Sequence, residues 1–262
     1  MLELYHHGTS VCAAKPRIVF GEKGLAWEGH YVDILKGEQF APAYLKLNPK
    51  GVVPTLVHDG HVIRESTLIC EYLDDVFPNP ALKPADPLHQ VAMRMWTKRL
   101  DEEIHAVTGP ITFAISHRHA VLANSPEVVE EYINTMGPQE AVQRRQRLET
   151  GIEDPLATRS LKVMDKFLAD IEAALATRPW LAGDTFSLAE VGVIPYINRL
   201  DMLQLSGMWT QARPHLTGWW QRIKARPMFQ AALFGFVTPP LRQLMTEKGV
   251  EAWPKVKAIL AA

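Results

Sequence analysis

Pro54 stands directly before an apolar run, Thr55-Leu56-Val57, whose residue types are those of a β-strand. Proline has no amide proton to donate to a sheet, so Pro54 belongs at the start of that strand, where a cis bond to Val53 fits. The main-chain groups of Val53 would then be unpaired. An extended, peptide-like ligand could take them up by pairing with Val53 as an added strand.

A second motif, Glu65-Ser66, lies where a strand over residues 61–64 passes into an apolar helix that begins near Ser66. Glu65 can accept hydrogen bonds from an ammonium group. The Ser66 hydroxyl and the amides at the helix start can bind the neighbouring carboxylate. The two motifs together predict a peptide ligand with the zwitterionic head of an amino acid.

Val53-Pro54 and Glu65-Ser66, in this order and at this spacing, resemble the glutathione-binding half of the glutathione transferases. The resemblance implies that Val53 pairs with the cysteinyl part of glutathione, the co-substrate, and that Glu65 and Ser66 hold its γ-glutamyl part. It also implies that Gln39 binds the glycyl carboxylate, although simple solvent exposure would equally explain a glutamine there. Lys36 could serve instead.

The apolar pattern predicts an α+β chain with a thioredoxin-like βαβ-ββα domain followed by an all-α helical bundle. We expect the first domain over residues 1–80, a proline-rich linker over 81–87, which no helix or strand can cross, and the helical domain over 88–262. The elements expected in the first domain are strands at 2–5, 31–34, 55–57 and 61–63, a helix that ends at Gly24, a short irregular helix within 39–47, a turn at Asp59-Gly60 and a helix over 66–77.

Two features of the helical domain stand out. Ser187 and Glu190 form the pattern of a capping box, in which each side chain bonds the main chain of the other. Residues 116–154 form a segment that a minimal glutathione transferase lacks. This segment, together with Lys15-Pro16 and residues 71–78, resembles the bacterial β-etherase branch, whose members use glutathione to cleave aryl ethers of lignin fragments. A structural elaboration without a substrate role would also explain the segment.

A glutathione transferase must hold the thiol of its substrate as a thiolate. Lowering a thiol pKa of about 8.5 by about two units requires ~2.7 kcal/mol. One hydrogen bond to a charged group supplies roughly 1.5–3 kcal/mol, and a helix N-terminus supplies up to about 2 kcal/mol. Ser10, just ahead of the first helix, is placed to donate that hydrogen bond, and it matches the catalytic serine of zeta- and theta-like transferases.

Cys12 competes for this role, since some transferases with a first-turn cysteine form mixed disulfides with glutathione. In those enzymes the cysteine generally occupies the position of Ser10, which favours the serine. Thr9 or a main-chain amide remains a third choice. Pro16 lacks the amide that would bond the Cys12 carbonyl, so an irregular first turn is expected.

Electrophile contacts are expected from the helical domain, where His105, Phe113, His117 and Arg118 are the candidates, each also explicable as a structural residue. No metal site is expected. His6 and His7 point to opposite faces of a strand, and His117 and His119 lie far apart around a helix.

The composition of this chain of 262 residues limits the kinds of partner that it is expected to bind. A net charge of -1 gives no electrostatic footprint for nucleic acid or an anionic membrane, and no apolar run approaches the roughly 20 residues of a membrane span. Two cysteines, Cys12 and Cys70, do not make a disulfide framework, and no signal peptide precedes the first strand, so a cytoplasmic location is expected. The family resemblance implies a homodimer, with Tyr72, Met95 and Trp96 near the interface.

The preferred hypothesis is therefore a glutathione transferase-like enzyme that activates the glutathione thiol for attack on a hydrophobic or aromatic electrophile, including an aryl ether. A thiol-disulfide oxidoreductase based on Cys12 is the second hypothesis. The third is a non-catalytic protein that binds glutathione or another ligand on the same fold.

Overall fold

The computed structural model describes residues 1–135 and 137–262. They form two compact units, neither of which is continuous in sequence. Unit 1 contains residues 1–98, 174–197 and 218–238, and unit 2 contains residues 99–173, 198–217 and 239–262. The division into residues 1–80, 81–87 and 88–262 therefore stays a prediction about sequence domains.

Unit 1 contains a four-stranded sheet in the order β2-β1-β3-β4. The central strand β1 (Leu2–His6) runs parallel to β2 (Glu28–Tyr31) and antiparallel to β3 (Thr55–His58), which pairs in turn with β4 (His61–Arg64). β3 and β4 meet at the predicted Asp59-Gly60 turn, where both residues have positive φ. This is the thioredoxin-like arrangement that the sequence predicts.

The second strand differs from its prediction, since it spans Glu28–Tyr31 rather than residues 31–34. The sequence Glu-Gly-His-Tyr lacks the apolar alternation of a half-buried strand, so its pattern is weak. Cross-strand contacts with β1 compensate for this weakness. His30 Nε2 lies 2.9 Å from Glu3 Oε2, and the His30 ring stacks on Tyr5 with centroids 4.5 Å apart.

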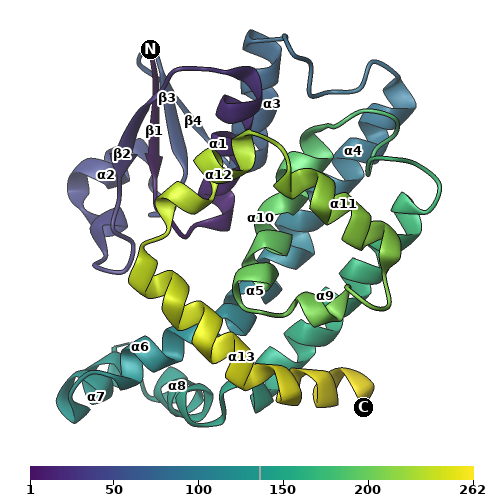
Figure 1. Ribbon diagram of the computed structural model, residues 1–262. Helices are drawn as coiled ribbons and strands as arrows, with labels where there is room; N and C mark the ends of the chain where they lie inside the picture. Colours follow the sequence, from purple (N-terminus) through teal and green to yellow (C-terminus); the bar gives the residue numbers. More distant parts are fainter. Residues whose placement is uncertain (136) are drawn as a thin grey trace. The chain divides into compact units, whose positions relative to one another are not determined.

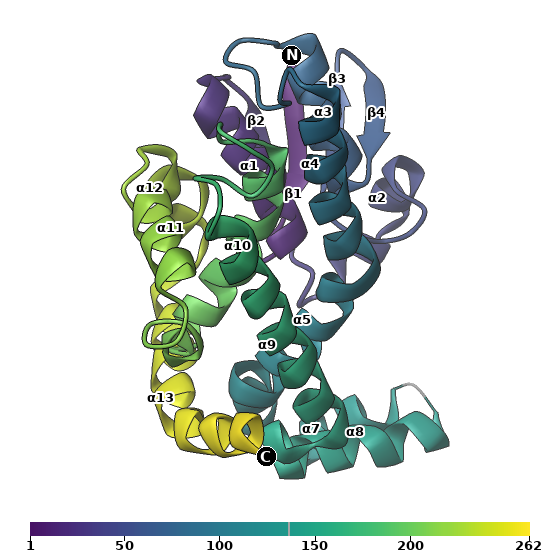
Figure 2. The same cartoon turned by 90° about the vertical axis from the view of Figure 1, so that its right-hand side faces the viewer.

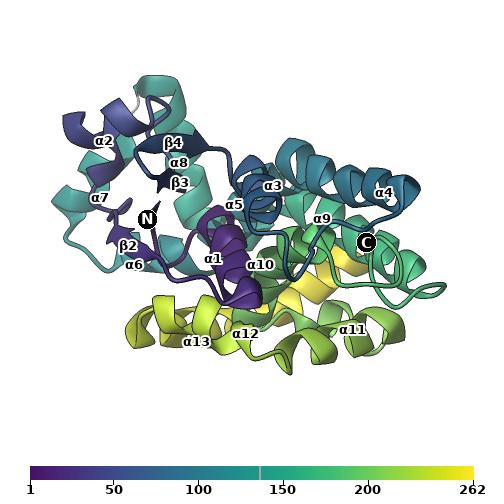
Figure 3. The same cartoon turned by 90° about the horizontal axis from the view of Figure 1, so that it is seen from above.

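Helices cover both faces of this sheet (Figure 1). Figure 3 shows α1 (Val11–Lys23) and α3 (Ser66–Val76) on one side and α2 (Pro42–Leu47) on the other. A single-turn helix, η1 (Glu38–Phe40), precedes α2, as expected of a short irregular helix. α1 ends at Gly24, which adopts φ 63° and donates its amide to the Phe20 carbonyl, the predicted C-cap.

A buried ion pair ties the proline-rich connector after α3 to α1. The Lys23 ammonium lies 2.7 Å from Asp74 Oδ1 and also donates to the carbonyls of Phe77 and Pro80. The Asp74 carboxylate accepts the amides of Leu82 and Lys83. Because both charges have several hydrogen-bond partners, this burial does not leave an unpaired ion.

The capping box lies in the part of unit 1 that contains the start of α10 (Leu188–Met202). Glu190 Oε2 accepts the amide and the hydroxyl of Ser187 at 2.9 and 2.8 Å, and the Ser187 oxygen accepts the Ala189 amide at 3.2 Å. Glu190 Oε1 also accepts the Leu181 amide. Burial raises the pKa of Glu190, and these hydrogen bonds oppose the rise.

One long helical stretch leads from unit 1 into unit 2. It begins as α4 (Pro87–Arg99) and contains two π-helical segments, η2 (Leu100–Ile104) and η3 (Phe113–His117), on either side of α5 (His105–Thr112). π-Helical segments are rare and frequently lie at functional sites. The second one contains two of the predicted electrophile contacts, Phe113 and His117.

The remaining helices complete the two units. α7 and α8 lie side by side as a hairpin in unit 2 (Figure 2). The remaining helices are α6 (Arg118–Leu122), α7 (Pro126–Asn134), α8 (Pro138–Thr150), η4 (Gly151–Glu153), α9 (Pro155–Leu175), η5 (Ser206–Met208), α11 (Pro214–Lys224), α12 (Met228–Ala232), η6 (Phe234–Phe236) and α13 (Pro239–Ala261). Among the described residues, no helix is both long enough and apolar enough to span a membrane.

Two glycines in the helices of unit 2 predict different effects of alanine. A methyl group on Gly249 in α13 would overlap the Leu203 main chain, whereas one on Gly109 in α5 would meet no atom of another part of the protein within 4 Å. We expect Gly249→Ala to destabilise the protein by about 1–3 kcal/mol. Gly109→Ala should change the stability by less than about 1 kcal/mol, because the higher helix propensity of alanine is offset by crowding of its methyl group against the Pro110 ring. Thermal unfolding of both variants checks this, and a gain in stability for Gly249→Ala would contradict the packing described here.

Candidate functional site

The turn from β1 into α1 carries the predicted catalytic residue, Ser10. Ser10 is the N-cap of α1, where its Oγ accepts the Ala13 amide at 3.1 Å and its carbonyl accepts the Ala14 amide at 3.0 Å. The first turn is thus regular, and the expectation of an irregular one is wrong. Pro16 lies inside α1, where its fixed φ suits the helix and one missing amide does not break it.

The cap leaves the Ser10 hydroxyl proton available. A serine hydroxyl has one O–H donor and two lone pairs, and the Ala13 amide uses only a lone pair. Ser10 is half-buried, so its proton can reach a ligand at the end of the helix. The hydroxyl can therefore cap α1 and donate to a thiolate at the same time.

The two competing residues lie on the same turn. Cys12 is a half-buried thiol at the second position of α1, outside any disulfide. The Thr9 hydroxyl lies 3.0 Å from His7 Nδ1. All three candidates lie at the positive end of the α1 dipole, which favours a thiolate whichever side chain contacts it.

Arg17 in α1 holds this turn from the protein interior. Its guanidinium is buried and donates to the carbonyls of His7, Gly8 and Ala232 at 3.0–3.2 Å, and it stacks over the Phe236 ring at 4.2 Å. Burial lowers the pKa of Arg17 to about 9, so the group stays charged at neutral pH. This role was not predicted from the sequence. In the sequence, this role of Arg17 is indicated by a single cation on an otherwise apolar helix face.

His6 lies beside Arg17 in an aromatic cage. Arg17 Nη1 is 3.3 Å from His6 Nδ1, and the rings of Trp27, Tyr31 and Phe236 surround the imidazole edge-on. Burial, with a smaller contribution from the Arg17 charge, lowers the pKa of His6 from 6.5 to about 4. The imidazole is therefore neutral in the folded protein at pH 7.

This shift predicts that the protein loses stability in mild acid. Below about pH 6.5 an unfolded His6 binds a proton that the folded site rejects, so the free energy of unfolding should fall as the pH drops from 6.5 towards 4. The contribution of His6 approaches ~3 kcal/mol near pH 4. Urea unfolding at several pH values measures it. His6→Gln can still accept a hydrogen bond from Arg17, and its free energy of unfolding should depend less on pH than that of the wild type. An identical pH dependence in the two proteins would show that His6 is not the group responsible.

The bend ahead of β3 presents the predicted peptide-pairing edge. The Val53–Pro54 bond is cis, and among the described residues no backbone hydrogen bond outside helices and strands involves Val53. Side chains secure the residue before it, since the Val52 carbonyl accepts from the Tyr44 hydroxyl at 2.7 Å and the Asn48 amide at 2.9 Å. The main chain of Val53 is therefore held in place yet open to a ligand. Tyr44 and Asn48 were not identified from the sequence.

Glu65 and Ser66 mark the start of α3. Glu65 has φ 67°, an uncommon conformation for a residue other than glycine, and its side chain does not cap the helix. Such strain persists where the surrounding structure imposes it, and it is common at ligand sites. The Glu65 carboxylate is exposed and lies 2.6 Å from the Lys50 ammonium. The first amides of α3 thus lack a side-chain cap from Glu65 and can bind a carboxylate.

The two candidates for the glycyl carboxylate differ in their surroundings. Gln39, in η1, is half-buried, and its Oε1 has no hydrogen-bond partner among the described residues. Buried polar atoms without a partner are rare, and this oxygen is an acceptor that needs a donor, which a carboxylate does not supply. Lys36 is exposed and lies 3.3 Å from Asp33. Gln39 could bind the carboxylate only through its side-chain NH2 group, so the choice between Gln39 and Lys36 stays a prediction.

The predicted electrophile contacts all lie in unit 2, on the continuous helical stretch. His105 is exposed, while Phe113 and His117 are half-buried. Arg118 donates to the Leu148 carbonyl at 2.7 Å and packs so closely on Gly151 that a methyl group there would lie 2.7 Å from its guanidinium carbon. Arg118 therefore has a structural role. Phe113 lines a cavity built by unit 2 alone, so its contact with the electrophile stays a prediction, as do those of His105 and His117.

Comparison with known proteins gives a consistent result. Residues 4–81 match the family model "Glutathione S-transferase, N-terminal domain", and residues 141–222 match "Glutathione S-transferase, C-terminal domain". Protein LigF of Sphingobium sp. strain SYK-6 is 35% identical over 234 residues, which is 86% of this chain and 90% of LigF. The tetrachloro-p-hydroquinone reductive dehalogenase of Sphingobium chlorophenolicum is 28% identical over 239 residues, 88% of this chain and 95% of the relative.

Solved structures agree with these sequence matches. The crystal structure of the beta-etherase LigF superposes with a TM-score of 0.74 at 33% identity, covering 89% of this chain and 99% of that one. Glutathione transferase F7 of Populus trichocarpa superposes with a TM-score of 0.71 at 25% identity, covering 91% and 100%. The similarity therefore extends over nearly the whole length of each protein.

Proposed function

The chain belongs to the glutathione S-transferase family, with glutathione as its co-substrate, and we propose that it cleaves aryl ethers by attack of the glutathione thiolate. The observation that carries this proposal is the similarity to the beta-etherase LigF along nearly the full length of both chains. The segment over residues 116–154, which resembles that branch, supports it.

Glutathione would bind at the end of the sheet in unit 1 where the inner strand β3 begins. Its cysteinyl amide and carbonyl would pair with the main chain of Val53, ahead of Pro54, as an added strand. The γ-glutamyl ammonium would lie against Glu65, and its carboxylate against the Ser66 hydroxyl and the first amides of α3. The side-chain NH2 group of Gln39 would donate to the glycyl carboxylate. We assign this binding to the sequence domain of residues 1–80 and the electrophile to that of 88–262.

Ser10 would activate the thiol. Its free O–H would donate to the thiolate, and the α1 dipole would add to the stabilisation. A hydrogen bond to a charged group supplies roughly 1.5–3 kcal/mol. Together these effects are large enough to supply the ~2.7 kcal/mol that a shift of about two pKa units requires.

The reaction conserves atoms and electrons without another reagent. The thiolate sulfur attacks the carbon that bears the aryloxy group, a C–S bond forms, and the C–O bond breaks with both electrons leaving on the phenolate oxygen. Solvent protonates the phenolate, and the product is a glutathione thioether. The thiol proton released on activation balances the proton taken up by the phenolate.

Phenol release from a β-aryl ether tests the proposal. With glutathione, the wild-type protein should release one phenol for each thioether formed, measured by chromatography of both products. Ser10→Ala should lower the rate constant of thioether formation by about 3-fold at pH 7 and about 8-fold at pH 6, because a rise of one unit in the thiol pKa, from about 6.5 to about 7.5, reduces the thiolate fraction by these factors. Cys12→Ala should retain most of the activity.

Two results would redirect the assignment. Full activity of Ser10→Ala with loss in Cys12→Ala would move the chemistry to Cys12. Glutathione binding without turnover of ethers or of a broad panel of aromatic electrophiles would favour a non-catalytic binding protein.

A Cys12-based thiol-disulfide oxidoreductase is the second candidate function. The half-buried Cys12 thiol at the N-terminus of α1 favours it, since a helix N-terminus promotes the thiolate. Incubation with oxidised glutathione followed by intact-mass measurement should show a mixed disulfide on Cys12 if this function is correct.

We also propose that the protein is a cytoplasmic homodimer that uses one apolar face of unit 1. Leu88, Val91 and Met95 recur at helical spacing along α4 and are 58–77% exposed, and Leu68 is exposed on α3. The Glu71–Arg94 ion pair links these two helices. Monomers rarely expose large contiguous apolar patches. Of the residues predicted near the interface, Met95 lies in this face. Tyr72 instead forms a hydrogen bond with His58, and Trp96 donates one to the Leu181 carbonyl.

The cytoplasmic location is supported by two cysteines that form no disulfide.

A charge introduced into this face should dissociate the dimer. Met95→Glu places a carboxylate in the apolar contact, which costs at least several kcal/mol if the contact is buried between two copies. Light scattering after gel filtration should give a dimer for the wild type and a monomer for Met95→Glu. Val142→Glu, at an exposed apolar position of α8, is the matched control and should stay dimeric. An unchanged mass for Met95→Glu would exclude this face.

A further inference from the structure

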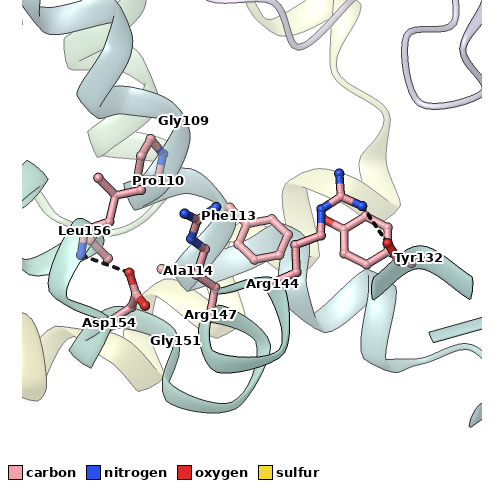
Figure 4. A pocket seen from close by; sticks show the side chains of 11 residues that line it. Gly109, Pro110, Phe113, Ala114, Tyr132, Arg144, Arg147, Gly151, Asp154 and Leu156 are labelled. Carbon is pink, nitrogen blue, oxygen red and sulfur yellow. Dashed lines mark hydrogen bonds between the residues drawn. The ribbon is translucent and has the colours of Figure 1, made fainter. Parts of the chain in front are cut away.

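Unit 2 contains a cavity of about 290 Å³ that the proposed chemistry does not use. It lies between the α5–η3 stretch, α7, α8 and the start of α9 (Figure 4). Pro110, Ala114, Leu156 and Ala157 give it an apolar wall. The volume is at the small end of the range for ligand pockets, about 300–1,000 Å³, and suits a molecule with one aromatic ring.

Two aromatic rings form another part of the wall. Phe113 and Tyr132 lie nearly parallel, with their centroids 6.5 Å apart and an angle of 16° between the ring planes. The Arg144 guanidinium lies 4.8 Å from the Tyr132 centroid. Rings held in this way offer flat surfaces against which a further ring can stack.

Two arginines from consecutive turns of α8 reach the same cavity. Figure 4 shows the guanidinium of Arg147 on one side of the Phe113 ring and that of Arg144 on the other. Arg144 donates to the Tyr132 carbonyl at 2.5 Å, and Arg147 donates to the Gln143 side chain at 3.0 Å. These acceptors are neutral and leave most of the donors on each fork available.

No carboxylate of the described residues forms an ion pair with Arg144 or Arg147. Arg145, between them on α8, points elsewhere and forms a bidentate pair with Glu130 at 2.8 Å. Among the described residues of the lining, the one acid is Asp154, whose buried carboxylate accepts the Leu156 amide at 2.9 Å at the start of α9. This lining therefore has one more positive than negative charge, and like charges one turn apart repel each other.

We propose that this cavity is a binding site for a small aromatic carboxylate. Its ring would stack against Phe113 and Tyr132, and its carboxylate would bind the guanidinium groups of Arg144 and Arg147, which match the planar geometry of a carboxylate. The site is built from unit 2 alone. It therefore goes beyond the proposed function, and binding requires no glutathione.

Calorimetric titration of the full chain without glutathione tests this site, with 4-methoxybenzoate as the probe and 4-methoxybenzamide as its neutral counterpart. The acid should bind about 10-fold more tightly than the amide, because hydrogen bonds to a charged group are the stronger ones. Arg147→Gln should weaken binding of the acid by about 10-fold and that of the amide much less. Arg145→Gln is the matched control on the same helix and should change neither by more than about 2-fold.

Arg144 also supports the main chain of α7, so Arg144→Lys accompanies Arg144→Gln, and thermal unfolding identifies variants that lose their fold. The lysine variant should keep part of the preference for the acid, and the glutamine variant should lose it. Three results would each overturn the proposal. The first is that the acid does not saturate the protein at about 10 mM, and the second is that acid and amide bind with equal affinity. The third is that Arg145→Gln and Arg147→Gln lose affinity for the acid to the same extent.

Discussion

The buried guanidinium of Arg17 is the interaction on which the candidate site depends. It bonds the carbonyls of His7 and Gly8, which lead into Ser10, and the carbonyl of Ala232 in a segment more than two hundred residues away in sequence. A side chain at Gly8 would not fit beside it, since a methyl group there would overlap the Phe236 carbonyl. The position of the Ser10 hydroxyl is thus fixed by contacts from within unit 1.

The site must keep parts of its own backbone open while holding them in place. A tripeptide ligand is recognised largely through main-chain groups, so the protein must leave the backbone accessible at Val53 and at the start of α3. Tyr44 and Asn48 fix the first of these positions, and the positive φ of Glu65 marks the second. Because such a ligand is recognised mainly by main-chain groups, the identity of any single side chain in the site gives little information about which ligand binds.

Much of the fold could be predicted because its signals are local. Gly24, Asp59-Gly60 and the apolar face of α3 each determine a cap, a turn or a helix through short-range geometry. The second strand was misplaced because Glu28–Tyr31 is stabilised by pairing with β1 rather than by its own pattern. The role of Arg17 was missed for a related reason, since its acceptors His7, Gly8 and Ala232 lie on other segments, the last of them 215 residues away. The predicted site residues also differ in their structural support. Ser10 combines a cap with a spare proton, whereas Arg118 supports the turn at Gly151, a role that spacing along the chain could not have distinguished from ligand binding.

The central claim is that the Ser10 hydroxyl stabilises the thiolate of bound glutathione, and the pKa of that thiol tests it most directly. Titration of the ultraviolet absorbance of the thiolate gives this pKa in the complex. The account predicts a value about two units below the ordinary value of about 8.5 for the wild type, and a rise of at least about one unit in Ser10→Ala with little change in glutathione affinity. The same thiol pKa in both proteins would contradict it.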